Sequence, residues 1–133
     1  MLFDYDLTVP SATPQTSPVL LQARLTRGIL REIRVSFPPG CATLVHTRIQ
    51  HNLLCLLPAN PDGDLNFDDT IIFSKMSYGL VSPPYEISIY AWAPSTTFDH
   101  TLTLQFELNP LPQITWQEFL TELAAQFSSP PGP

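Results

Sequence analysis

Apolar and polar residues alternate along two stretches in the second half of the chain. In YEISIYAW (85–92), Ile87 and Ile89 fall on one face, and in HTLTLQFEL (100–108) leucine and phenylalanine alternate with threonine, glutamine and glutamate. Successive side chains of a β-strand point to opposite faces, so each stretch predicts a strand with one buried face. Because the other face is polar, the sheet that holds them is expected to be antiparallel.

Comparable apolar runs recur from Val19 onward, separated by proline, glycine and asparagine. They predict strands near 19–26, 29–37, 42–50, 52–57, 70–74, 85–92 and 99–108. No helical pattern falls between these runs. Short strands at this spacing predict an all-β domain over residues 19–109, built as an antiparallel β-sandwich or jelly-roll-like fold.

The first eighteen residues are expected to form an N-terminal extended arm. Phe3, Tyr5 and Leu7 alternate with polar residues, which predicts a half-buried strand. The next segment, PSATPQTSP (10–18), is rich in proline and hydroxyl side chains and has little to bury. The strand is therefore expected at an edge of the sandwich or on another molecule, with Phe3, Tyr5 and Leu7 as candidate partner-binding residues.

The period of the pattern changes near the carboxyl end. Thr115 and Glu118 match a capping box, in which both side chains accept free N–H groups at a helix start. Apolar residues follow at helical spacing: Trp116, Phe119, Leu120, Leu123 and Phe127. Residues 110–133 are thus predicted to hold a linker, an amphipathic helix over about 115–127 and a disordered tail. The helix packs on its own sandwich or in a groove of a neighbour, and its apolar residues are candidate partner-binding residues.

The charge balance argues against two classes of partner. Twelve acidic and six basic residues give a net charge of −6, with pI near 4.7. Phosphate backbones and anionic membranes would be repelled by such a surface. No apolar run reaches the ~18 residues of a membrane span, and the N-terminus has acidic residues where a signal peptide carries basic ones. We expect neither nucleic acid nor membrane as a partner, and no ordinary secretion.

The basic residues concentrate in one place, at Arg24, Arg27, Arg31 and Arg34. Their spacing would fit one face of a helix. The apolar residues around them, however, scatter around a helical wheel and alternate cleanly over 33–37, as in a strand. The arginines are therefore interpreted as solvated charges and not as a nucleic-acid-binding surface.

The segment PANPDGDLNFDD (58–69) is rich in acidic residues and raises the question of a calcium site. An EF-hand loop that began at Asp62 would need glycine at its sixth position and glutamate at its twelfth, where this chain has Phe67 and Phe73. The stretch Asn60 to Gly63 instead predicts a tight turn in which the glycine adopts a positive φ. A looser calcium site in the same loop is an alternative.

Other reactive side chains lack the spacing of known sites. His46, His51 and His100 form no HxH or HExxH motif, and Cys41 and Cys55 form no CxxC motif. A GxSxG elbow is also absent from the sequence. No catalytic, metal-binding or cofactor-binding residue is assigned, and the protein is expected not to be an enzyme. The cysteines pair if strands bring them together, or stay free as small apolar side chains.

Several short motifs carry a resemblance to a known group of proteins. They are Gly28 at the opening of a strand, FPPGC, NPDGD, PPYE and DHTLTLQF, within about residues 27–108. With these motifs the chain resembles small β-sandwich accessory virion proteins of tailed phages. The resemblance implies a non-enzymatic capsid decoration or cement subunit, located in the virion after assembly in the host cytoplasm. Its partners would be other capsid subunits and copies of itself, often as trimers, tied together by the terminal arms.

The alternative function is a carbohydrate- or calcium-binding module of a fibre or adhesin. Exposed aromatic rings on β-sandwiches stack on sugars, and this chain offers a set of candidates: Tyr78, Tyr85, Tyr90, Trp92 and Phe98. Packing in the core is the default role of such residues.

Overall fold

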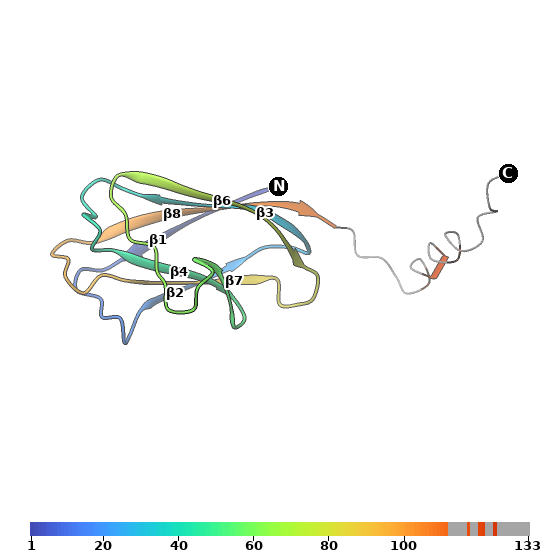
Figure 1. Cartoon of the computed structure of the whole chain (residues 1–133), viewed down its shortest axis with the longest axis horizontal. Helices are drawn as coiled ribbons and strands as arrows, with labels where there is room; N and C mark the ends of the chain where they lie inside the picture. Colours follow the sequence, from blue (N-terminus) through green and yellow to red (C-terminus); the bar gives the residue numbers. More distant parts are fainter. Residues whose placement is uncertain (112–116, 118–119, 122–123, 125–133) are drawn as a thin grey trace.

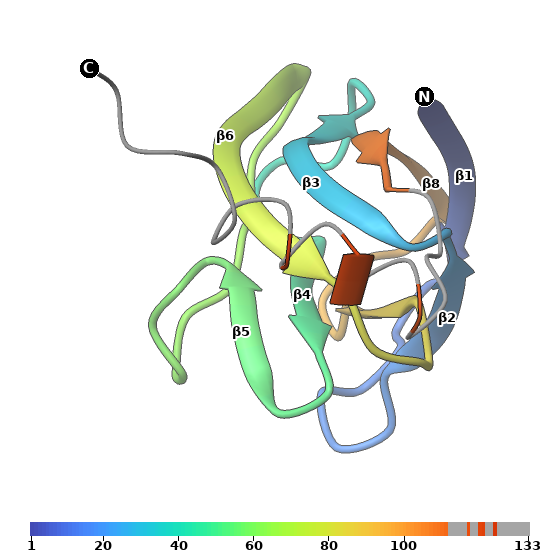
Figure 2. The ribbon, with the colours of Figure 1, turned by 90° about the vertical axis from the view of Figure 1, so that its right-hand side faces the viewer.

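Eight β-strands make up the part of the chain that the computed structural model describes, which comprises residues 1–111, 117, 120, 121 and 124. They are β1 (Leu2–Val9), β2 (Val19–Arg24), β3 (Gly28–Phe37), β4 (His46–His51), β5 (Leu54–Leu57), β6 (Thr70–Leu80), β7 (Glu86–Trp92) and β8 (His100–Pro110). Two four-stranded sheets, ordered β1-β8-β3-β6 and β2-β7-β4-β5, face each other (Figures 1 and 2). The prediction of an all-β antiparallel sandwich is confirmed.

The strands are wound in a jelly-roll-like manner. β1 pairs with β8, β2 with β7, β3 with β6 and β4 with β5, and each pair is antiparallel. Wrapping one long antiparallel hairpin so that successive pairs fall in alternate sheets produces this order. As a result, the first and last strands of the sandwich lie side by side. Their paired residues are about 100 positions apart in the sequence, as in the pair Leu2 and Glu107.

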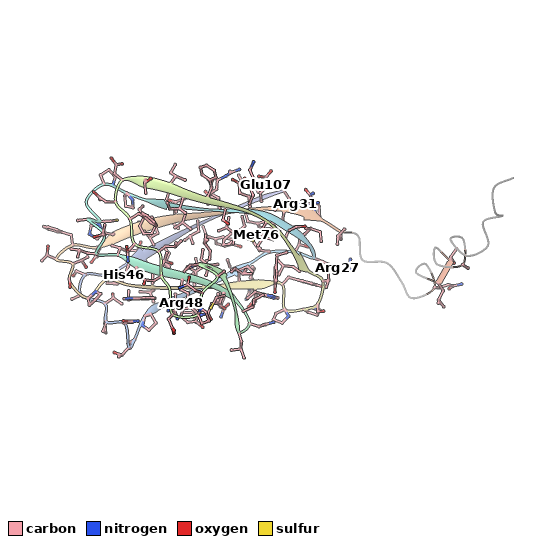
Figure 3. The ribbon with its side chains drawn as sticks, viewed as in Figure 1. Arg27, Arg31, His46, Arg48, Met76 and Glu107 are labelled. Carbon is pink, nitrogen blue, oxygen red and sulfur yellow. The ribbon has the colours of Figure 1, made fainter. Side chains whose placement is uncertain are left out.

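Period-two alternation creates the core between the sheets. On β8 the side chains of Leu102, Leu104 and Phe106 have no solvent exposure, while Thr101 and Glu107 on the opposite face are exposed. Full burial of one such apolar side chain contributes about 1.5–3 kcal/mol to folding. The opposing sheet supplies matching rows from β7 and β4, and Met76 of β6 lies between the sheets (Figure 3).

Two of the strands differ from the prediction by more than two residues at one end. The predicted strand 70–74 continues to Leu80, because Met76, Tyr78 and Leu80 keep pointing inward in alternation with small or charged residues. The predicted strand 42–50 begins only at His46, since Ala42 and Thr43 have positive φ angles of 49° and 60° that an extended strand excludes.

The turn predicted at Asn60 to Gly63 is confirmed, but the positive φ expected for its glycine is not. The Gly63 N–H donates to the Asn60 carbonyl at 3.1 Å. The φ of Gly63 is not among the positive values. A Cβ at this position would lie 2.4 Å from the end of the exposed Asn60 side chain, which can move aside, so the turn does not depend on glycine.

The arginine-rich segment is extended, as the alternation over 33–37 predicted. Arg24 ends β2, and Arg31 and Arg34 lie on β3, whose register shifts between Leu30 and Glu32 at a bulge. Such a bulge inserts one residue and re-aims the side chains beyond it. It allows Leu30 and Ile33 both to point into the core, although they are three positions apart and a regular strand would place them on opposite faces.

Candidate functional site

The N-terminal strand belongs to the protein's own sandwich. Of the two predicted locations, the structure shows the sheet edge, where β1 pairs with β8 along its whole length. Leu7 is buried in the core at 5% exposure, and Phe3 and Tyr5 are half-buried against it. The Tyr5 ring meets Phe106 edge-on at 6.3 Å, and its hydroxyl donates to the Arg24 carbonyl. The sandwich therefore begins at residue 2 and not at residue 19.

The segment after β1 is also tied to the sandwich. Thr13 forms an isolated bridge with Ala93, whose N–H donates to the Thr13 carbonyl at 2.9 Å. The Ser11 N–H donates to the Asp99 carboxylate at 2.8 Å. These contacts hold residues 10–18 against the loop between β7 and β8, so this segment does not extend freely from the domain.

Most of the predicted C-terminal helix lies outside the described residues. Trp116, Phe119, Leu123 and Phe127 are among the residues that the structure does not describe, and the helix over 115–127 stays a prediction. The described positions 117, 120, 121 and 124 are helical and exposed, and the Thr121 hydroxyl donates to the Gln117 carbonyl at 2.9 Å. Leu120, a candidate partner-binding residue, is 45% exposed.

The acidic loop uses its carboxylates for contacts within the protein. One Asp68 oxygen accepts the N–H groups of Gly40 and Ala42, each at 3.0 Å. Asp64 pairs with the His46 ring, and Asn66 donates to Asp64 at 3.2 Å. The loop is thus cross-linked to the neighbouring turn and to β4.

A polar cluster that sequence reasoning missed covers the outer face of the sheet β2-β7-β4-β5. The His46 ring stacks on Trp92 with centroids 5.7 Å apart and planes inclined by 6°, and the Arg48 guanidinium carbon lies 5.8 Å from the centre of the same indole. Figure 3 shows His46 and Arg48 on neighbouring positions of this sheet. Because these side chains cover it, Trp92 is only 6% exposed and offers no face for stacking on a sugar.

A second histidine lies in an apolar environment at the end of the sandwich. His51 is 8% exposed, its Nδ1 is 2.5 Å from the Tyr78 hydroxyl, and the two rings meet edge-on. The His51 Nε2 is buried without a hydrogen-bond partner among the described residues. Burial raises the pKa of the Tyr78 phenol above its usual value. Tyr78 therefore points inward and is not part of an exposed aromatic platform.

The outer face of the other sheet, β1-β8-β3-β6, is mainly polar over β1, β8 and β3, although Leu2 at the start of β1 is 53% exposed. Arg34 on β3 donates to Glu32 at 3.0 Å and to Glu107 at 3.1 Å, and these contacts, with the Glu32 bond first, raise the pKa of its guanidinium. Thr103 donates to Asp6 at 3.0 Å. Figure 3 shows Arg31 and Glu107 on this side of the molecule. These strands present a hydrogen-bonded, solvated surface.

The fourth strand of this face, β6, is different because it exposes large apolar side chains. Ile71 is 58% exposed and Phe73 is 64% exposed. Their cross-strand neighbours on β3 are Ser36 and Arg34. Beside Ile71 lies a hollow of about 210 Å³, lined by Arg34, Ser36, Ile71, Thr103 and Gln105. We refer to Ile71, Phe73 and the residues lining this hollow as the β6 patch.

A second hollow extends the β6 patch around the end of the sheet. It measures about 450 Å³ and is lined by Ser36, Phe37, Pro38, Pro39, Asp69, Thr70 and Ile71. Ser36 and Ile71 border both hollows. Among the described strands, β6 pairs with β3 alone, so its other edge has no partner in that part of the chain. Apolar side chains, adjoining hollows and an open strand edge therefore meet at one place.

Other exposed apolar residues are scattered. Leu53 and Leu54 lie at the β4–β5 hairpin with 97% and 53% exposure, and Phe98 is 75% exposed in the β7–β8 loop. Single exposed apolar residues are normal on protein surfaces. None of these three residues lines either hollow of the β6 patch.

Both cysteines are free. Cys41 is fully buried, and burial, with the nearby Asp68 charge second, raises the pKa of its thiol. Cys55 is half-buried and accepts a weak hydrogen bond from the Gln50 amide at 3.8 Å. The cysteines therefore behave as separate thiols of different accessibility.

Among the described residues, no three His, Cys, Asp or Glu side chains gather as metal ligands would. No helix in that part of the chain has the length and apolar character needed to cross a bilayer.

No protein-family model matches the chain, and no curated protein matches it. A solved structure of the Tobacco streak virus coat protein dimer is similar to it, with a TM-score of 0.38 and 13% sequence identity. The similarity covers 88% of this chain and 93% of that chain. A likeness of this size does not transfer a function from one protein to the other.

Proposed function

We propose that the chain is a non-enzymatic structural subunit of a virus particle, a capsid decoration or cement protein that attaches to the shell and to copies of itself. The jelly-roll-like winding of its strands supports this by analogy, since capsid proteins use that architecture. Lectin domains use it as well, so the fold by itself leaves the choice to surface features.

The observation that carries the proposal is the β6 patch. Ile71 and Phe73 are more than half exposed on a sheet face that is otherwise mainly polar and hydrogen-bonded, with Leu2 at its far edge. Covering both side chains contributes about 2–4 kcal/mol. A binding free energy of this size holds one subunit only weakly. On a symmetric shell many such contacts act together, so the attachment becomes firm through avidity.

The C-terminal segment supplies the second half of the contact in this proposal. Its partner-binding residues are Trp116, Phe119, Leu120, Leu123 and Phe127, which the sequence places at helical spacing. A segment that orders only on binding loses conformational entropy, so large apolar side chains are needed to hold it. Phe3, Tyr5 and Leu7 are not part of the proposed contact, because β1 completes the protein's own sheet.

A shell-binding experiment tests the proposed function. The full chain is mixed with empty shells of the particle that carries it, and the shells are sedimented. We expect the full chain to sediment with the shells. Deletion of residues 112–133 should abolish this, whereas deletion of 128–133, which leaves the apolar residues in place, should not. A full chain that stays in the supernatant at every concentration contradicts the proposal.

The alternative function, a carbohydrate- or calcium-binding module, predicts results that the proposed function does not. A glycan-binding module would bind glycan arrays, and a calcium module would melt at higher temperature with calcium than with a chelator. The proposal predicts neither result, because His46 and Arg48 cover Trp92 and the Asp64 and Asp68 carboxylates already have protein partners.

A further inference from the structure

We propose that the β6 patch is the docking site for the C-terminal segment, residues 115–127, of a neighbouring copy of this chain. The inference rests on the proposed function, since it names the partner of the terminal segment. It adds that one copy supplies the segment and the next copy supplies the patch.

The shape of the β6 patch suits a helix that carries bulky side chains. Ser36 and Thr103 are small residues on adjacent strands, paired across the β3–β8 ladder, and they leave the hollow of about 210 Å³ between larger neighbours. Ile71 borders this hollow, and Phe73 lies two residues further along the outer side of β6. An amphipathic helix recognises such a groove by inserting aromatic or leucine side chains spaced three or four residues apart. The segment has this spacing at Trp116, Phe119, Leu120, Leu123 and Phe127.

The charges on the two surfaces are complementary. Residues 112–133 contain Glu118 and Glu122 but no lysine or arginine. Arg31 and Lys75 are exposed on β3 and β6 beside the patch, and the ion pairs found within the described residues involve neither of them. The acidic residues nearby are Glu32 and Glu107, which pair with Arg34, and Asp69, which lines the second hollow. Opposite charges at the rim of an apolar contact favour encounter and fix its orientation. An acidic helix is therefore the matching occupant for this side of the sheet.

The position of the chain end favours a neighbour over the same copy. β8 ends at Pro110, which pairs with Gly28, whereas the hollow lies beside Thr103 at the other end of the sheet. Seven residues of strand separate these two points, or about 23 Å. The chain leaves β8 heading away from the hollow, so docking within one copy requires a reversal at residues 111–114. Leu120, moreover, is exposed in the single chain.

The first experiment asks whether the two surfaces contribute to self-association. The dissociation constant of the full chain is measured by sedimentation equilibrium for Phe73→Asp, Phe119→Asp and a control, Phe98→Asp. We expect the first two changes to weaken association at least about tenfold, as loss of a buried aromatic contact does. Phe98 is even more exposed than Phe73, at 75% against 64%, but lies in the β7–β8 loop outside the patch, so its change should alter the constant less than about threefold. Equal effects of all three variants overturn the proposal.

A charge exchange then separates docking between copies from docking within one copy. One variant carries Arg31→Glu and Lys75→Glu beside the patch, and the other carries Glu118→Lys and Glu122→Lys on the segment. Each variant alone places like charges at the contact and should be monomeric. In an equimolar mixture, the patch of each variant is opposite in charge to the segment of the other variant and equal in charge to its own segment. Association should therefore return, and only between copies of different variants. A mixture that stays monomeric overturns the proposal, as does a wild-type chain that is monomeric throughout.

The shell-binding experiment shows whether a failure lies with this inference or with the proposed function. If the charge exchange behaves as expected but the chain never sediments with shells, the proposed function fails and the docking between copies stands. If the wild type sediments with the shells while the charge-exchange mixture stays monomeric, the docking between copies fails and the shell attachment stands.

Discussion

At the scale of single residues, two glycines on paired strands have opposite requirements for space. A Cβ on Gly28 would lie 2.3 Å from the Asn109 carbonyl oxygen and 2.6 Å from the Leu108 side chain. A Cβ on Gly79 would have Val81 as its nearest neighbour, at 3.4 Å. Gly28 thus permits the close approach of β3 and β8, whereas Gly79 lies on the exposed side of β6.

This difference gives a prediction for two matched substitutions. Gly28→Ala should lower the free energy of unfolding by more than about 2 kcal/mol, because backbone atoms of β8 must move. Gly79→Ala should change it by less than about 1 kcal/mol, since glycine is already unfavourable in a strand interior. Urea denaturation of both variants and the wild type measures these values. Similar losses at the two positions would show that the close approach is not present.

The two thiols also differ at this scale, and the difference has a pH dependence. The raised pKa of Cys41 favours its protonated form in the folded state. The free energy of unfolding is therefore highest below the ordinary thiol pKa of about 8.5, where the thiol is protonated in both states. It declines as the pH rises past that value, because the unfolded chain then loses the proton more readily than the folded protein. We expect iodoacetamide at pH 8 to modify Cys55 in the native protein and Cys41 only on unfolding.

Mass spectrometry of the modified peptides measures this prediction. Cys55→Ser is the matched control, since its native protein should then show almost no modification. In addition, the free energy of unfolding should fall less steeply above pH 9 in Cys41→Ala than in the wild type. Equal native reactivity of the two thiols would contradict the buried position of Cys41.

At the scale of elements, alternation predicted the strands where it was clean. β7 and β8 were predicted to within about two residues, because their inward residues are all aliphatic or aromatic. The second half of β6 was missed because Lys75, Ser77 and Gly79 on its outer side resemble a loop composition. The same strand held an overlooked signal: three consecutive apolar residues, Ile71 to Phe73, must place some of them on the outer face.

Strand partners could not be derived from local sequence. The partner of β1 lies about 90 to 100 residues away on β8, and only the assembled sheet shows that Leu7 belongs to the core. The same holds for the outer cluster of His46, Arg48 and Trp92, which pairing between β4 and β7 brings together. A cluster of side chains that forms only when two strands pair in a particular register cannot be predicted from the spacing of its residues along the chain.

The connection between β3 and β4 depends on one acidic side chain. Asp68 accepts two N–H groups from a turn in which Gly40, Ala42 and Thr43 have positive φ angles. Asp68→Ala should therefore lower the free energy of unfolding by about 1–2 kcal/mol, because it removes charge-assisted hydrogen bonds that hold an unfavourable backbone. Asp62→Ala, at an exposed position of the neighbouring turn, should cost less than about 0.5 kcal/mol.

Thermal or urea denaturation compares these two variants under identical conditions. A calcium titration of the wild type complements them, since a loop held by internal hydrogen bonds should show no calcium-dependent change in melting temperature. An equal effect of the two substitutions, or a rise in melting temperature with calcium, would contradict the described role of Asp68.

At the scale of the whole molecule, the sandwich has a closed core, but part of its surface leaves apolar side chains exposed. The two sheets bury a continuous core, and both ends of the N-terminal strand are tied to β8. The β6 patch stays exposed, and so does Leu120 in the C-terminal segment. A subunit of this kind folds alone and completes its apolar surface by assembly.

The native mass of the full chain, compared with that of residues 1–111, tests this account most directly. Sedimentation equilibrium over a concentration range gives both masses. We predict that the full chain forms oligomers below about 100 µM, the range of a weak but specific contact, while residues 1–111 stay monomeric and folded. Two monomers with identical sedimentation throughout that range would contradict the account.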